Sequence, residues 1–139
     1  MEIYTLGKNS EKKAYKEAIK KFVDYAQKSD PTAPKNKWYV GISNDPERRQ
    51  KEHEQKLQKD DIRCLRFMSL VRCEDRDTAH KLEIMLAEEG FAIHRKDLKP
   101  AVKTMESNIV EEIVYVYIYL TETAAERVER AIRLSKLRT

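Results

Sequence analysis

The sequence predicts an α+β fold with a small, mainly antiparallel sheet of three to four strands flanked by helices. Helix-like and strand-like segments alternate along the chain, which taken alone suggests a parallel α/β sheet. The apolar runs of the strand segments are short and mixed with charge, and this favours an exposed or antiparallel sheet. The length of 139 residues predicts one domain spanning residues 1–139, with a modest core.

The first half of the chain predicts two strands and two helices. Residues 1–6 are expected to form a short strand, followed by an extra N-terminal helix over about residues 10–27. A loop with two prolines leads to a strand over residues 37–43. The next helix covers residues 46–58, because Asp45 suits its N-cap and Pro46 suits its first position.

The second half predicts a strand over residues 62–73 and a helix over residues 78–89, with Asp77 as its cap and Gly90 as its end. Residues 91–108 are irregular and basic. A C-terminal strand over residues 112–120 precedes the last helix, whose start carries a capping box made of Thr123 and Glu126.

Charge and composition narrow the class of protein. Charged residues make up 37% of the chain, no apolar run approaches the length of a membrane span, and no secretory leader opens the sequence. We therefore expect a cytoplasmic protein without a membrane partner. Cys64 and Cys73 lack a metal-binding spacing and are expected to be reduced and structural. The net charge of +4 permits a polyanion partner without requiring one.

The predicted helix over residues 46–58 has Leu57 as its only large apolar residue, so it can contribute little burial energy. Arg49 and His53 lie four residues apart and therefore share one helix face. That face is either a solvated surface rich in ion pairs or a site that meets an anion. Arg grips phosphate oxygens with a planar, always charged fork, and His can move a proton near neutral pH.

The predicted helix over residues 78–89 places a carboxylate, Glu83, at the edge of its apolar stripe. A carboxylate there is costly unless it has a partner. The partner is either a nearby Arg or a hard divalent ion such as Mg²⁺, which takes oxygen ligands and keeps waters.

Three tyrosines, Tyr115, Tyr117 and Tyr119, alternate along one face of the predicted C-terminal strand. Tyrosine suits a half-buried sheet with its hydroxyl at the rim. The alternatives are a surface on which bases stack or a catalytic phenol.

Together these placements resemble the GIY-YIG nuclease superfamily over about residues 37–90. Its second motif is a strand ending in Tyr-Ile/Val-Gly, followed by a helix with an Arg ten residues past the Tyr and often a His one turn later. Here the motif reads Tyr39-Val40-Gly41, then Arg49 and His53. The family continues with a strand and a helix that bears one metal-binding Glu, and Glu83 stands at that point.

The first motif of the family, Gly-Ile-Tyr, does not precede Tyr39 in its usual place. Two arrangements remain open. Ile3-Tyr4 preserves the order of the motifs and is preferred, with Tyr4 as the motif tyrosine. Alternatively, the strand over residues 112–120 supplies the motif from the far end of the chain, with Tyr115, Tyr117 or Tyr119 in that role. The family also has an Asn beyond the Glu helix, for which Asn108 is the candidate.

The resemblance implies a metal-dependent DNA endonuclease that hydrolyses phosphodiester bonds with one Mg²⁺ or Mn²⁺. Glu83 would hold the metal, and Arg49 would hold the phosphate oxygens as charge builds on them. Tyr39, with Tyr4 or His53, would take the proton from the attacking water. Gly41 would serve as a structural turn. The remaining DNA phosphates would be held by basic side chains, namely Arg48, Lys51, Lys56, Arg95, Lys96 and Lys99.

Two other functions remain open. A catalytically inactive GIY-YIG-like module would bind nucleic acid without needing Glu83 or a metal. An α+β interaction protein would instead form a homodimer by pairing the strand over residues 112–120 with its own copy. The expected partner is DNA, with RNA as an open alternative.

Overall fold

A computed structural model describes residues 3–93 and 112–137, which form an α+β fold with four helices and one open five-stranded mixed sheet. The strands are β1 (Tyr4–Leu6), β2 (Trp38–Ser43), β3 (Ile62–Cys73), β4 (Ala92–Ile93) and β5 (Val114–Thr123). The helices are α1 (Lys12–Ser29), α2 (Pro46–Gln58), α3 (Arg76–Glu89) and α4 (Ala124–Leu137), and the 3-10 turn η1 (Lys35–Lys37) precedes β2.

β5, the last of the described strands, lies in the middle of the sheet, whose order is β1-β3-β5-β2-β4. It runs antiparallel to both of its neighbours, β3 and β2. The short outer strands β1 and β4 pair in parallel with β3 and β2. The α+β class is thus confirmed. The expected three to four strands are too few, because the two short parallel strands extend the described sheet to five.

The central position of β5 also corrects the expected homodimer edge. Trp38 to Ser43 of β2 pair with Leu120 to Tyr115 on one side of β5. The β3 strand pairs along the other side, from Ile62 opposite Thr123 to Cys73 opposite Val114. Because both edges of β5 pair with strands of the same chain, a second copy cannot add a strand there.

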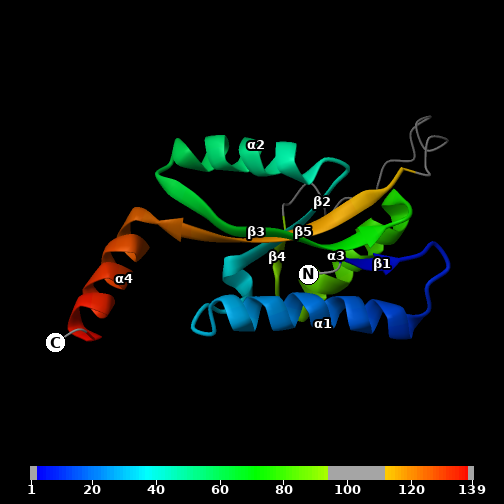
Figure 1. The fold of residues 1–139 in the computed structure, drawn as a ribbon, viewed down its shortest axis with the longest axis horizontal. Helices are drawn as coiled ribbons and strands as arrows, with labels where there is room; N and C mark the ends of the chain where they lie inside the picture. The colour runs from blue at the N-terminus through cyan, green and yellow to red at the C-terminus, as the bar shows by residue number, and fades with distance from the viewer. Residues whose placement is uncertain (1–2, 94–111, 138–139) are drawn as a thin grey trace.

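Helices cover both faces of the sheet. α1 and α3 lie on one face, and α2 lies on the other (Figure 1). The core forms on the α1/α3 face, where large side chains from the sheet and both helices are fully buried. Examples are Leu6, Phe22, Trp38, Val40, Val71, Leu82, Leu86, Val116 and Ile118. Burying each such aliphatic or Phe side chain contributes about 1.5–3 kcal/mol.

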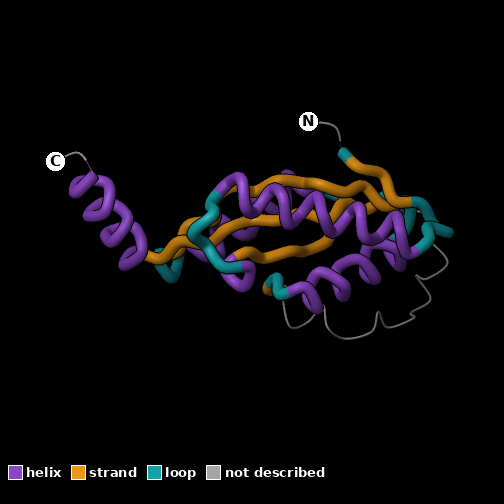
Figure 2. The backbone as a smooth tube through the Cα atoms, turned by 90° about the horizontal axis from the view of Figure 1, so that it is seen from below, coloured by secondary structure: helices purple, strands orange, loops and turns teal. Residues whose placement is uncertain are grey.

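α4 departs from this layered arrangement. It leaves the end of β5 and projects away from the sheet (Figures 1 and 2). No residue of α4 is buried. Among the described helices, none is long and apolar enough to cross a membrane.

The predicted starts of α2 and α4 are confirmed. The Asp45 carboxylate accepts a hydrogen bond from the Arg48 amide at 3.2 Å, and Pro46 opens α2. At the start of α4, the Thr123 amide donates to Glu126 Oε1 at 3.3 Å, and the Glu126 amide donates to Thr123 Oγ1 at 3.2 Å. This is the reciprocal pattern of a capping box.

The cap of α3 is Asp75 rather than Asp77. The Asp75 carboxylate accepts from the Thr78 amide at 2.8 Å, so α3 begins two residues earlier than predicted. Asp77 lies in the first turn, where a negative charge interacts favourably with the helix dipole. Gly90 ends α3 as predicted, with a left-handed φ of 117° that glycine adopts without strain.

Candidate functional site

A buried pair of polar side chains joins α2 to the sheet. His53 Nε2 and Tyr117 Oη lie 2.8 Å apart, and both side chains are buried between α2 and the sheet. The imidazole tautomer decides which of the two groups donates. Burying such groups costs little only when they are hydrogen-bonded. The contact therefore helps a helix with one large apolar residue to pack against the sheet.

Gly41 makes room for Tyr117. The two residues stand opposite each other in the register of β2 and β5. A Cβ atom on residue 41 would lie 2.5 Å from Tyr117 Cζ, closer than real Cβ contacts allow. The expected role of Gly41 as a turn is corrected, because it lies inside β2 and its missing side chain lets the phenol cross the strand.

An aromatic layer surrounds this pair under α2. Tyr39 stacks on Tyr119 with ring centroids 5.5 Å apart, and Phe67 stacks on Tyr117 at 4.6 Å. The His53 ring lies 4.9 Å from that of Tyr119. Burial, reinforced by the nearby Tyr117 phenol, raises the pKa of Tyr119 above its ordinary value. Tyr117 and Tyr119 are buried, so they present no surface on which bases could stack. Tyr39 is only half-buried.

Arg49 borders this layer and reaches solvent, with 29% of its side chain exposed. Its Nη1 lies 3.1 Å from Glu52 Oε2. Partial burial lowers the pKa of the Arg49 guanidinium, but the Tyr117 phenol and the Glu52 carboxylate outweigh this and leave the pKa above its ordinary value. Arg49 is therefore a fixed positive charge, held beside the Tyr117 hydroxyl and partly open to solvent.

Tyr4 does not join this cluster, which corrects its preferred role as the first-motif tyrosine. It lies on β1 at the edge of the sheet and packs against the core on the α1 side. Its hydroxyl donates to the Ala14 carbonyl of α1 at 3.3 Å. Among the alternatives left open by the sequence, the Tyr117 hydroxyl contacts His53 Nε2 and borders the Arg49 guanidinium, whereas Tyr119 meets His53 through its ring.

Glu83 is separated from Arg49 by the sheet. α3 carries Glu83 on the face opposite α2 (Figure 1), and the Glu83 side chain is fully buried there. Its Oε1 lies 3.6 Å from His80 Nδ1. The expected convergence of Arg49, His53 and Glu83 around one phosphate is therefore wrong for Glu83.

The surroundings of Glu83 also fit the expected Mg²⁺ or Mn²⁺ poorly. Mg²⁺ binds through one or two carboxylates and keeps several waters. The Glu83 carboxylate has no exposed surface, and the His80 imidazole lies beside it. Among residues 3–93 and 112–137, no group of three or more His, Cys, Asp or Glu could hold a metal ion.

The charges of α2 divide between its two sides. At about 100° per residue, one sector of the helix surface carries Arg48, Arg49, Lys56 and, just past the helix end, Lys59. We call these four residues the basic side of α2. Glu52 lies within this sector and pairs with Arg48 at 3.5 Å and with Arg49. Lys51, also expected to bind phosphate, is exposed just outside it.

The remaining candidates, Arg95, Lys96, Lys99 and Asn108, lie outside the described residues.

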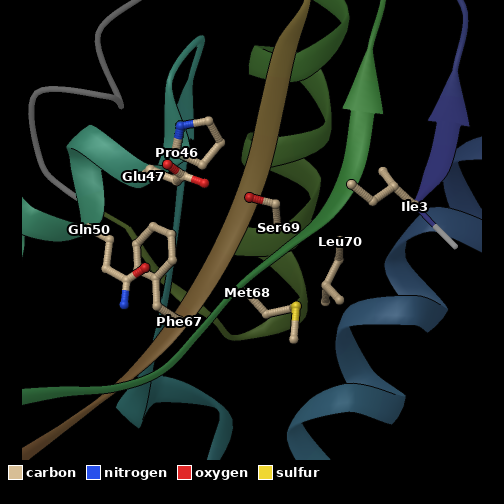
Figure 3. A pocket seen from close by; sticks show the side chains of 8 residues that line it. All are labelled: Ile3, Pro46, Glu47, Gln50, Phe67, Met68, Ser69 and Leu70. Atoms are coloured by element: carbon tan, nitrogen blue, oxygen red, sulfur yellow. The ribbon is translucent and has the colours of Figure 1, made fainter. Parts of the chain in front are cut away.

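The opposite side of α2 borders a hollow of about 290 Å³ beside β3 (Figure 3). Glu47 and Gln50 line it from α2, and Phe67, Met68 and Leu70 line it from β3. Its described lining carries a carboxylate but no Lys or Arg. This hollow is therefore unsuited to a phosphate, and the basic side of α2 is the better candidate.

Comparisons with known protein families, curated proteins and solved structures found no match to this chain. The interpretation of the site therefore rests on its geometry. Sequence reasoning gave no role to Phe67, because an aromatic residue on a strand carries no signal of what it stacks against.

Proposed function

We propose that this chain is a GIY-YIG-like domain in permuted strand order, which binds the phosphodiester backbone of DNA at the basic side of α2. The observation that carries the proposal is Arg49, a partly exposed guanidinium held between Tyr117 and Glu52. The spatial arrangement of β5, β2 and α2 around Arg49 supports the resemblance to the GIY-YIG superfamily. β5 supplies a tyrosine opposite Gly41 of the Tyr39-Val40-Gly41 strand, and α2 supplies Arg49 and His53.

The basic side of α2 suits a backbone rather than base edges. Arg48, Lys56 and Lys59 are exposed beside Arg49 and can each meet a phosphate. The ion pairs of Glu52 with Arg48 and Arg49 are exposed, and such pairs contribute only about 0–1 kcal/mol, so phosphate oxygens can replace them cheaply. Half-buried Tyr39 adds a partly exposed ring to the aromatic layer under α2. Contacts of this kind give affinity without sequence choice.

Fluorescence polarisation with a labelled DNA duplex tests the proposal. Arg49→Ala and Lys56→Ala should each weaken binding and reduce the slope of log affinity against log salt by about one. Lys13→Ala and Lys20→Ala are matched controls, because these exposed lysines lie on α1, across the sheet. Equal losses from all four variants would contradict a site on α2. A competing RNA duplex distinguishes the open RNA alternative.

Phosphodiester hydrolysis is the second candidate, favoured by the 2.8 Å contact between His53 Nε2 and Tyr117 Oη. His53 can accept the Tyr117 proton, and the Arg49 charge stabilises the phenolate that remains. The phenolate can then take a proton from a water molecule, and the oxygen of that water attacks phosphorus. The bond from phosphorus to the leaving oxygen breaks, and that oxygen takes a proton from solvent. His53 returns its proton to solvent, which restores the starting state. Arg49 balances the charge that builds on the phosphate oxygens. Because Glu83 does not fit the expected metal, no step involves a metal.

Nicking of supercoiled plasmid, with Mg²⁺, with Mn²⁺ and with EDTA, separates the two candidates. Hydrolysis requires cutting by the wild type that Tyr117→Phe abolishes while DNA affinity is retained. Binding without cutting by either protein leaves the binding module alone. The loss of both activities in Arg49→Ala, but not in Lys20→Ala, would assign them to the same site.

A further inference from the structure

α4 carries an apolar stripe that the rest of the described chain leaves uncovered. The stripe consists of Val128, Ala131, Ile132 and Ser135. Their spacing of three, one and three residues places them on one helix face. Val128 is 58% exposed and Ile132 is 49% exposed. No α4 residue is buried, and the helix stands clear of the sheet (Figures 1 and 2). Leu134 and Leu137 are also exposed, but their spacing places them on other sides of α4. An apolar helix face normally packs against a partner.

The base of α4 is fixed to the domain by ion pairs. Arg127 Nη2 lies 2.9 Å from Asp61 Oδ1, and Arg130 Nη2 lies 3.1 Å from Glu122 Oε1. Glu126 pairs with Lys37 at 2.5 Å. Glu126 and Arg130 lie away from the stripe, and Arg127 borders it. These ion pairs hold α4 in its projecting position while Val128 and Ile132 stay open.

We propose that the stripe pairs with the α4 helix of a second copy of this chain, in antiparallel orientation about a two-fold axis near Ala131 and Ile132. Around such an axis Val128 of one copy meets Ser135 of the other, and Ala131 meets Ile132. The small Ala131 and Ser135 side chains let the helix backbones approach, while Val128 and Ile132 fill the space beside them. An isologous contact of this kind closes as a dimer and leaves no surface for further growth.

The charges beside the stripe are arranged to complement a second copy. Glu129 and Lys136 lie along the same flank of the stripe, one near each end. Antiparallel pairing brings this flank of one helix against the same flank of the other. Glu129 of each copy then faces Lys136 of its partner, which gives two opposite-charge contacts per dimer. A self-complementary pattern of this kind favours a second copy over an unrelated partner.

The projection of α4 leaves space for this arrangement. The helix has 14 residues and is therefore about 21 Å long. Antiparallel pairing places the partner's domain beyond the far end of α4, away from the sheet of the first copy (Figure 1). One helix pair covers less than the about 1,200 Å² buried in stable complexes, so the dimer should form only at high protein concentration.

Sedimentation equilibrium of the full chain, from low micromolar to near-millimolar concentration, tests the proposal. The wild type should pass from monomer to dimer, and Val128→Glu or Ile132→Glu should raise the dissociation constant by about tenfold or more. Ile84→Glu is the matched control, because Ile84 is an exposed isoleucine on α3 and should leave the equilibrium unchanged. Because no α4 residue is buried, circular dichroism should show unchanged folding in the α4 variants.

Charge exchange tests the orientation. Glu129→Lys and Lys136→Glu should each weaken the dimer, and the double variant should restore it. A wild type that stays monomeric at every concentration would overturn the proposal, and so would a dimer unaffected by Val128→Glu. Binding of a monomeric wild type to phospholipid vesicles would instead assign the stripe to a lipid surface and would also overturn it.

Discussion

Gly41 and Tyr117 face each other across β2 and β5, and the Tyr117 phenol fills the space that any side chain at position 41 would need. This relationship fixes where the Tyr117 hydroxyl lies. It places the hydroxyl under α2, within 2.8 Å of His53 Nε2. A residue without a side chain on one strand thus positions a polar group that meets a helix.

Gly41→Ala should therefore destabilise the protein. The added methyl group must push the Tyr117 ring from its position, and overpacking of this kind typically costs about 1–3 kcal/mol. Urea unfolding measures the loss. Gly7→Ala is the control, because its Cβ would lie 3.6 Å from the nearest atoms, in the Glu74 side chain. Similar losses in the two variants would mean that the Tyr117 ring does not confine position 41.

The hydrogen bond between Tyr117 and His53 should appear as an energetic coupling. A double-mutant cycle of Tyr117→Phe and His53→Ala should give a coupling energy of about 1 kcal/mol, the usual net contribution of one hydrogen bond. Tyr25→Phe with His53→Ala is the matched cycle, because the Tyr25 hydroxyl donates to the Arg66 carbonyl instead. That second pair should be additive. Additivity in both cycles would argue against the Tyr117–His53 contact.

Divalent ions should leave the melting temperature of this protein unchanged. A metal that binds only the folded state stabilises it by about 2.7 kcal/mol at a hundredfold excess over its dissociation constant. The buried position of Glu83 across the sheet from Arg49 predicts no such gain with Mg²⁺ or Mn²⁺. Differential scanning fluorimetry checks this. A metal-dependent rise that Glu83→Gln removes would restore Glu83 as a metal ligand.

Stability should fall at alkaline pH because of a buried thiol. Burial, with a smaller effect of the Asp75 charge, raises the pKa of Cys73 to about 12. In the unfolded chain the thiol titrates near about pH 8.5. The contribution of the raised pKa to the free energy of unfolding is therefore complete below that pH, and it is lost as the pH rises towards the folded pKa. The free energy of unfolding should decrease by about 1.4 kcal/mol per pH unit in this window.

Urea unfolding between about pH 7 and about pH 10 measures this slope. Cys73→Ala removes the titrating group and should flatten the dependence. Burial also raises the pKa of Cys64 to about 12, so the variant should retain part of the slope. An unchanged slope in Cys73→Ala would show that the Cys73 thiol titrates alike in the folded and unfolded chains, and would contradict its raised folded pKa.

The sequence predicted the local features of the fold well. The Asp45 and Pro46 signals placed α2, the Thr123 and Glu126 pattern placed α4, and Gly90 ended α3. Each of these signals acts within a few residues of chain. The spacing of Arg49 and His53 also correctly placed the two side chains on one helix face, because helix geometry alone decides it.

The long-range features were beyond the sequence. Alternating residues on β5 reveal two faces, but not that β5 lies between β2 and β3, since strand order depends on contacts across the whole chain. Motif order along the chain favours Tyr4 over Tyr117, and that order carries no information about which strand lies beside β2. The position of Glu83 at the edge of an apolar stripe indicated burial, yet the face of the sheet that α3 covers decided whether it could meet Arg49.

The central place of β5 has a consequence for the order in which this protein can fold. β2 and β3 are synthesised early, but they have no direct pairing with each other and must wait for residues 114–123 to be inserted between them. A ribosome-bound chain that ends before β5 exposes two unpaired strand edges, a state prone to self-association. Closure of the sheet is thus delayed until residues 114–123 have left the ribosome, and a nascent-chain series that crosses β5 should acquire protease resistance abruptly there.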